Sequence, residues 1–249
     1  MSLFTRIKAT TSRLALPSIA RADIRYISDL EEDAYEHWVF DGTTSAVLTG
    51  RINERALTPQ SAAPGYDSSG ILVSGASGSG LLTDIADQND LRKTFFCVAK
   101  TPFFASGSPA PLFGTHASTS GFMLTDGSGD PSNKQVFVRG STNALPFSGG
   151  SFAPDVWRFF CLSFDGKSGQ RTLRLLINSE DYSSIVPNLY SSTSGAFVAL
   201  GNGYYSAGTA VSTRFAEFGV VDDILTQADM QALYGRAKTR LAARGIAIA

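Results

Sequence analysis

From residue 37 to residue 221, apolar residues occur in short runs that are separated by Gly, Ser, Asp and Pro. Runs of this length that are rich in aromatic and β-branched residues predict β-strands rather than helices. They lie at 37–40, 45–48, 70–73, 94–100, 121–125, 134–139, 156–164, 171–177, 196–200 and 214–221. About ten short strands with turns between them predict an all-β sandwich or jelly roll.

The C-terminal segment carries the strongest helical pattern in the chain. Thr226 and Asp229 have the spacing of the N-cap and N3 residues of a capping box. Apolar residues then recur at helical spacing, at Met230, Leu233, Tyr234, Ala237 and Leu241. Gly245 is a natural end point. We predict a helix over 226–244 whose apolar face packs against the sandwich.

Residues 1–34 differ from the rest of the chain in charge. Their basic residues before the first acid, Asp23, are Arg6, Lys8, Arg13 and Arg21. We predict an extended N-terminal arm over 1–34, in front of a single sandwich domain over 35–249. The four basic residues are the candidates for attaching the arm to a partner. A transit peptide and plain disorder are the alternatives for this segment.

Composition excludes several functional classes. Lys plus Arg is 21 and Asp plus Glu is 22, which gives a net charge of −1. A free-standing nucleic-acid binder needs an excess of cations, so we expect no nucleic-acid partner. The 2 cysteines exclude a disulfide scaffold. No apolar run reaches the length of about 18 residues that a transmembrane helix needs, so we expect no membrane insertion.

Several segments together resemble one fold family. Residues 157–166 (WRFFCLSFDG) and 173–177 (LRLLI) resemble a hairpin of the concanavalin A-like, laminin G-type sandwich. Residues 94–100 and 198–202 (VALGN) resemble two of its strands, and residues 215–226 (FAEFGVVDDILT) resemble its last strand and helix entry. The resemblance covers residues 36–244 and implies a jelly-roll sandwich of two antiparallel sheets.

Three local sequence features of the chain also resemble those of laminin G-like domains in virion proteins of tailed bacteriophages. The features are the Gly/Ser turn at 75–80, the Ala-rich terminal helix and the ending RGIAIA at 244–249. This resemblance implies a non-enzymatic virion subunit, assembled in the host cytoplasm and attached to other virion proteins through the arm. It further implies a homo-oligomer, with a trimer favoured, that binds host surface polysaccharide. A purely structural head, collar or baseplate subunit is the alternative.

Sugar binding needs an aromatic platform and a few polar groups, and loops at one end of a sandwich commonly carry recognition. Residues of these types fall in segments that resemble loops. They are Tyr204, Tyr205, His116, Asn143 and Tyr190. We take these five as the candidate glycan-binding residues.

Metal and catalytic chemistry have weaker signals. Asp126, Ser128 and Asp130 place oxygen atoms at alternate positions, as calcium loops do, although Asp-Gly is also ordinary hairpin-turn chemistry. We expect no cofactor and keep calcium as the alternative.

A retaining glycosidase needs two carboxylates about 5–5.5 Å apart. Glu217 and Asp222 are five positions apart and would face opposite sides of a strand, so we expect no enzyme and keep a glycan hydrolase as a second alternative.

Overall fold

The computed structural model describes residues 31, 33–102, 110–126, 135–138, 141–144, 153–166, 171–186, 190–206 and 211–249. They belong to one compact unit, Glu31–Ala249, which begins four residues before the predicted boundary at 35. Residues 1–30 of the predicted arm, with Arg6, Lys8, Arg13 and Arg21, lie outside the described residues.

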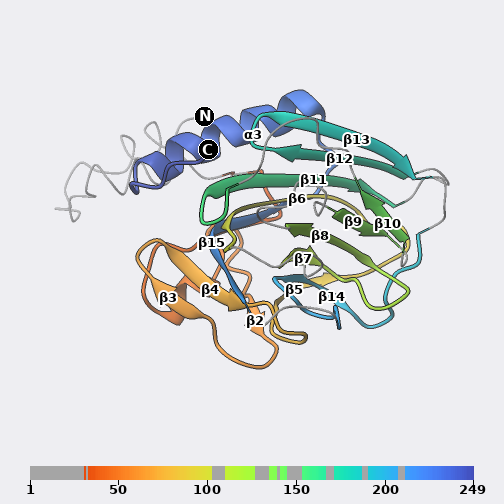
Figure 1. Ribbon diagram of the computed structural model, residues 1–249, viewed down its shortest axis with the longest axis horizontal. Helices are drawn as coiled ribbons and strands as arrows, with labels where there is room; N and C mark the ends of the chain where they lie inside the picture. The colour runs from red at the N-terminus through yellow and green to blue at the C-terminus, as the bar shows by residue number, and fades with distance from the viewer. Residues whose placement is uncertain are drawn as a thin grey trace, which may run out of the picture. The chain divides into compact units, whose positions relative to one another are not determined.

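Two antiparallel sheets face each other in the unit, as Figure 1 shows. The eight-stranded sheet has the order β13-β12-β11-β6-β15-β4-β3, and β1 pairs with β15 beside that path. Its strands are β1 (Glu36–Val39), β3 (Gly65–Asp67), β4 (Gly70–Ser74), β6 (Arg92–Lys100), β11 (Trp157–Asp165), β12 (Arg171–Ile177), β13 (Glu180–Val186) and β15 (Ser212–Val221). The predicted all-β sandwich of antiparallel sheets with a C-terminal helix is confirmed.

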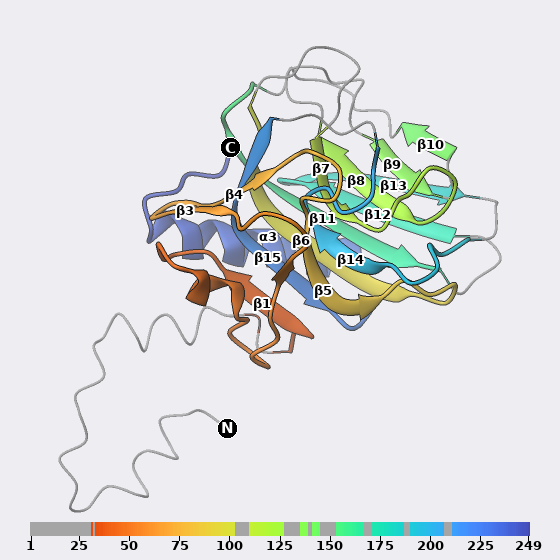
Figure 2. The ribbon, with the colours of Figure 1, turned by 90° about the horizontal axis from the view of Figure 1, so that it is seen from below.

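The seven-stranded sheet has the order β10-β9-β8-β7-β14-β5-β2. Its strands are β2 (Thr58–Pro59), β5 (Leu81–Ala86), β7 (Ala110–Gly114), β8 (Phe122–Asp126), β9 (Gln135–Val138), β10 (Ser141–Ala144) and β14 (Phe197–Leu200). Figure 2 shows β5, β14, β7 and β8 side by side in front of the other sheet. The predicted hairpin of 121–125 and 134–139 is present as β8 and β9.

The main core lies between the sheets and follows the alternation of side chains along each strand. On β6, Phe95 and Cys97 point into this core, whereas Phe96 and Val98 belong to a second apolar cluster. That second cluster lies on the outer face of the eight-stranded sheet. A strand that is apolar on both faces must be covered on both, and the helix supplies the second cover.

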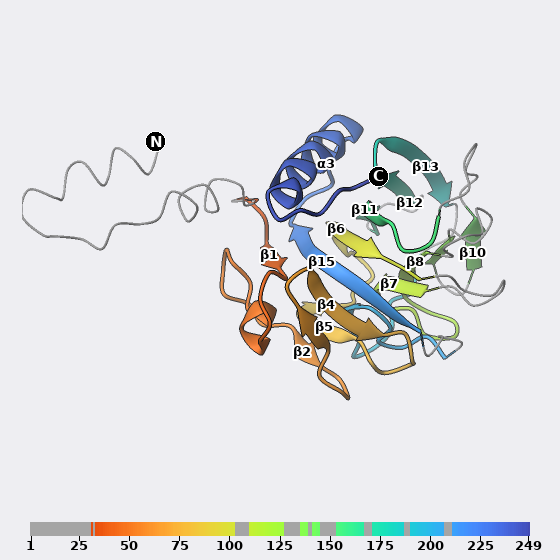
Figure 3. The same ribbon diagram turned by 60° about the vertical axis from the view of Figure 1, so that its left-hand side comes forward.

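Helix α3 (Gln227–Ala242) covers that outer face, and Figure 3 shows it beside β15, β6 and β11. The predicted capping box of Thr226 and Asp229 is present. The buried apolar residues of α3 pack against apolar residues of the eight-stranded sheet. On the helix these are Met230, Leu233, Ala237 and Leu241, and on the sheet they are Phe96, Val98, Phe159, Cys161 and Leu176. The helix ends before 244 because Gly245, at φ +74°, turns the chain, and the N–H of Ile246 then donates to the carbonyl of Leu241. The side chain of Arg244 donates to the backbone carbonyls of Ala216 and Phe40.

Some predicted elements were wrong or were missed. Residues 45–48 form a 3-10 helix, η1 (Ser45–Leu48), and not a strand. A run of four apolar residues does not distinguish the two by pattern. Strands β2, β3, β5, β7, β10 and β13 were not predicted. In β7 the signal is broken by Pro111, which lies at a shift in the strand register.

Gly235 in the middle of α3 is a point of avoidable instability. A Cβ atom at this position would have nothing within 4 Å. We expect Gly235→Ala to raise the free energy of unfolding by about 0.5–1 kcal/mol in urea titrations, because alanine loses less conformational freedom in a helix. Gly245→Ala is the matched control. Its φ of +74° favours glycine, so this change should lower stability. Equal effects of both changes would contradict the account.

Candidate functional site

The loop that follows β14, residues 201–206, is held by the side chain of Asn202. The amide nitrogen of Asn202 donates to the carbonyl of Gly75 at 2.8 Å and to that of Tyr205 at 3.0 Å. Its amide oxygen accepts from the backbone N–H of Tyr205 at 2.9 Å. This buried residue therefore ties the loop both to itself and to the turn between β4 and β5.

The loop folds back over the outer face of β14. Ala199 alternates with the core residues of β14, and a Cβ atom on Gly203 would lie 2.8 Å from the Cβ of Ala199. The hydroxyl of Tyr204 reaches Phe197 at the start of the strand, where it donates to the carbonyl and accepts from the N–H, both at 3.0 Å. Burial raises the pKa of Tyr204, so it keeps its proton at neutral pH.

The ring of Tyr205 contacts the ring of His116, which lies in the loop between β7 and β8, and the two ring centroids are 5.7 Å apart. His116 is 4% exposed, and Nδ1 of its imidazole lies 3.0 Å from the carbonyl oxygen of Ser120. Burial lowers the pKa of His116, although the contact with Ser120 opposes this effect. A neutral ring that donates through Nδ1 follows. The buried, neutral ring of His116 therefore packs against the ring of Tyr205.

A buried carboxylate joins the segments beneath this surface. Asp87 follows β5 and accepts from the hydroxyl of Thr115 and the N–H of Thr193, both at 2.7 Å, and from the hydroxyl of Tyr190. Burial raises the pKa of Asp87, while these three hydrogen bonds act in the opposite direction. The carboxylate of Asp87 therefore holds the segments 115–121 and 190–196 together, because each segment donates hydrogen bonds to it.

The structure thus brings together three of the five glycan-binding candidates. Tyr204 and Tyr205 are half-buried and adjacent, and His116 contacts Tyr205. Sequence reasoning missed Phe197, which is 40% exposed beside them because it faces away from the core at the start of β14. We call Phe197, Tyr204, Tyr205 and His116 the aromatic cluster. Phe197, Tyr204 and Tyr205 are partly exposed, His116 is buried against Tyr205, and hydrogen bonds of Asn202 and Tyr204 hold the backbone.

The other two candidates lie elsewhere. Tyr190 is buried in the core, with its ring 5.0 Å from that of Phe164, so it does not offer a ring to solvent. Tertiary packing decides this burial, and the loop-like sequence around Tyr190 does not show it. Asn143 lies in strand β10 and not in a loop, at the far edge of the seven-stranded sheet from β14.

Of the three calcium-ligand candidates, Asp126, Ser128 and Asp130, the structure describes only Asp126. Asp126 ends β8 and is fully buried, where it accepts from the hydroxyl of Thr101 and lies 3.4 Å from the guanidinium of Arg158. The hydroxyl of Thr101 and the guanidinium of Arg158 both contact Oδ2 of Asp126. Ser128 and Asp130 lie outside the described residues. Within the described part of the chain, no group of three metal-ligating side chains occurs.

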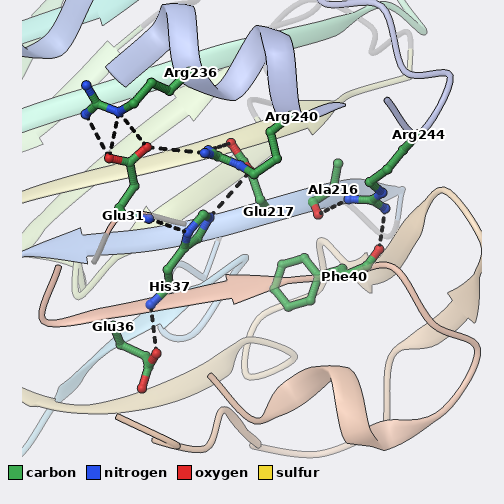
Figure 4. Close-up of polar contacts among 9 residues, drawn as sticks. All are labelled: Glu31, Glu36, His37, Phe40, Ala216, Glu217, Arg236, Arg240 and Arg244. Carbon is green, nitrogen blue, oxygen red and sulfur yellow. Dashed lines mark hydrogen bonds and ion pairs between the residues drawn. The ribbon is translucent and has the colours of Figure 1, made fainter. Parts of the chain in front are cut away.

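A second polar cluster lies under α3 and is drawn in Figure 4. Glu217 on β15 accepts from Nε and Nη2 of Arg240 at 2.8 and 3.0 Å, and its carboxylate lies 3.4 Å from Nε2 of His37. Burial alone would raise the pKa of Glu217, but Arg240 and His37 lower it to about 2. Glu31 completes the cluster by binding Arg236 and Arg240.

This cluster bears on the hydrolase alternative. Glu217 is 0% exposed and is enclosed by Arg240 and His37, so no sugar reaches it. Asp222 is exposed and pairs with Lys93 instead. These two carboxylates therefore do not form the pair that glycosidase chemistry requires. Separately, among the described residues no helix has the length and apolar character of a membrane span.

No protein-family model matches the sequence, and no curated protein matches it. Solved structures do match it. The botulinum neurotoxin serotype G binding domain has a TM-score of 0.59 at 11% identity, over 83% of this chain and 51% of that chain. The receptor binding domain of botulinum neurotoxin D has a TM-score of 0.56 at 11% identity, over 82% and 52%.

A Trypanosoma rangeli sialidase has a TM-score of 0.53 at 13% identity, over 81% of this chain and 32% of that chain. The chain therefore spans about half the length of the toxin domains and about a third of the sialidase. At these identities the likeness shows a shared β-sandwich fold.

Proposed function

We propose that this chain is a non-catalytic, lectin-like module that binds glycan at the aromatic cluster. The observation that carries the proposal is the pair of half-buried tyrosines, 204 and 205, on a loop that Asn202 holds in one conformation. A fixed aromatic surface loses little conformational entropy when it binds a sugar ring. The neighbours support this class, since two are named as binding domains and one as a sialidase in complex with a difluoro-nononic acid.

The finer proposal is a concanavalin A-like, laminin G-like virion subunit of a tailed bacteriophage that attaches to other virion proteins through residues 1–34. It rests on the sequence resemblance and on the basic residues of that segment, Arg6, Lys8, Arg13 and Arg21. Single sugar sites are weak, so several copies per particle, with a trimer favoured, would supply the avidity.

A pull-down on surface polysaccharides from candidate host bacteria tests the functional class. We expect the full-length protein to be retained without releasing new reducing ends, and to be retained equally with a calcium chelator. New reducing ends would support the hydrolase alternative. Loss of binding on chelation would restore the calcium loop at Asp126, Ser128 and Asp130. No retention on any polysaccharide would favour the purely structural virion subunit.

The role of the aromatic cluster predicts the effect of removing one ring. We expect Tyr205→Ala to weaken binding to a retained polysaccharide by at least about tenfold, since central aromatic contacts carry most of the energy in such sites. Surface plasmon resonance on immobilised polysaccharide measures this change. The matched control is Tyr66→Ala, which removes a half-buried tyrosine on β3 of the other sheet. Equal losses for both variants would contradict the assignment.

A further inference from the structure

Charged residues are absent from the segments that build the aromatic cluster. The stretches 68–83, 101–125 and 182–213 contain no Asp, Glu, Lys or Arg, although charged residues make up 17% of the chain. These stretches supply the turn between β4 and β5, the loop between β7 and β8, and the loops on both sides of β14. We infer that the ligand of the aromatic cluster is a neutral glycan that bears no carboxylate, sulfate or phosphate.

This inference rests on the proposed function and adds the class of ligand. An acidic sugar requires a cation at its binding site, because removing a carboxylate from water without a partner is costly. On β5, the strand beside β14, Asp84 forms an ion pair with Arg55, so that cation is already paired with an acid. Lys93 pairs with Asp222 and Arg214 pairs with Asp67, and both of these cations lie on the other sheet. The cluster therefore lacks, among its described residues, the partner that an acidic sugar needs.

The one described carboxylate that holds the site together has the wrong sign for an acidic ligand. Asp87 accepts hydrogen bonds from Thr115, Tyr190 and Thr193. It directly follows Ala86, the β5 partner of Phe197, and its backbone N–H donates to the carbonyl of Ala196 at 2.8 Å, so it lies next to the start of β14. An anionic sugar over this surface would meet repulsion from Asp87 with no compensating attraction.

His116 does not change this balance. Burial lowers its pKa, so the imidazole is neutral at physiological pH and supplies no positive charge. Exposed hydroxyls lie in the loops that carry the cluster, and hydroxyls both donate and accept hydrogen bonds as sugar hydroxyls do. Exposed examples are Ser118, Thr119 and Ser206. A surface of tyrosines with small hydroxyl residues and glycines is also the composition that antibody binding loops use.

The test compares each acidic polysaccharide of a panel with its own carboxyl-reduced form, together with neutral polysaccharides, using the full-length protein. Carboxyl reduction keeps the sugar chain and removes the charge. We expect the protein to bind the neutral and carboxyl-reduced polysaccharides with an affinity at least about tenfold higher than for the acidic parents. This affinity should change little between low and high salt.

Three outcomes separate the two claims. Tighter binding of the acidic parents that weakens as salt rises would overturn the neutral-ligand inference and leave the glycan-binding function intact. Equal binding of both forms would also overturn it, because charge would then play no part. Binding of no polysaccharide in either form would refute the proposed function itself, and this inference with it.

Discussion

Arg240→Met is expected to lower the free energy of unfolding by about 3–5 kcal/mol. The change removes the main partner of Glu217, a carboxylate that is 0% exposed, and leaves its charge buried. Urea unfolding followed by circular dichroism measures the effect. Arg236→Met is the control, because the side chain of Arg236 is 52% exposed and its pair with Glu31 is largely screened by solvent. We expect a loss below about 1 kcal/mol for this control.

The pH dependence of the Arg240→Met effect gives a second check. In the wild type, the pKa of Glu217 is depressed to about 2, so its contribution to stability is present above pH 4.5 and is lost as the pH falls toward 2. In the variant, burial raises this pKa, so protonation relieves the buried charge. We expect the difference in the free energy of unfolding between the wild type and Arg240→Met to become smaller as the pH falls. A double variant with Glu217→Met should recover part of the loss, and no recovery would contradict the account.

Glu36→Gln is expected to cost at least about 3 kcal/mol, because the carboxylate of Glu36 accepts four backbone N–H groups. Oε1 binds those of His37 and Ile52, both at 2.8 Å, and Oε2 binds those of Asn53 and Arg55 at 3.0 and 2.9 Å. An amide side chain keeps one oxygen and turns an NH₂ group toward two of these donors.

Glu54→Gln is the matched control for this change, since Glu54 lies in the same loop with an exposed side chain. We expect its effect to stay within about 0.5 kcal/mol. Amide hydrogen exchange locates the damage. Exchange should speed up at residues 52, 53 and 55 in Glu36→Gln, while α3 keeps its protection. Uniform loss of protection across both regions would argue against a local role for this carboxylate.

Features that depend on neighbouring residues in the chain were predictable from the sequence. The capping box of Thr226 and Asp229 joins two residues three positions apart, and the apolar stripe after it follows helical spacing. The strands at 94–100 and 171–177 are likewise long runs of β-forming residues. In contrast, η1 and β7 are short or are interrupted by proline, so local pattern carries too little information to place them.

The site was predictable only in part, because it depends on residues that are distant in sequence. The loop-like surroundings of Tyr204 and Tyr205 were visible in the sequence, whereas the contact between Tyr205 and His116 joins segments 89 positions apart. The burial of Tyr190 and the Arg158 partner of Asp126 are also tertiary effects. Phe197 was missed because an aromatic residue that starts an apolar strand looks like a core residue.

The central claim is that the aromatic cluster is where this sandwich binds glycan. The most direct test is amide hydrogen exchange of the full-length protein with and without a polysaccharide that retains it in the pull-down. We predict slower exchange at residues 115–121 and 201–206, and no change in α3 or at β3 and β4. Slower exchange confined to α3 or to the β3–β4 hairpin would contradict the account and place the binding surface on the eight-stranded sheet.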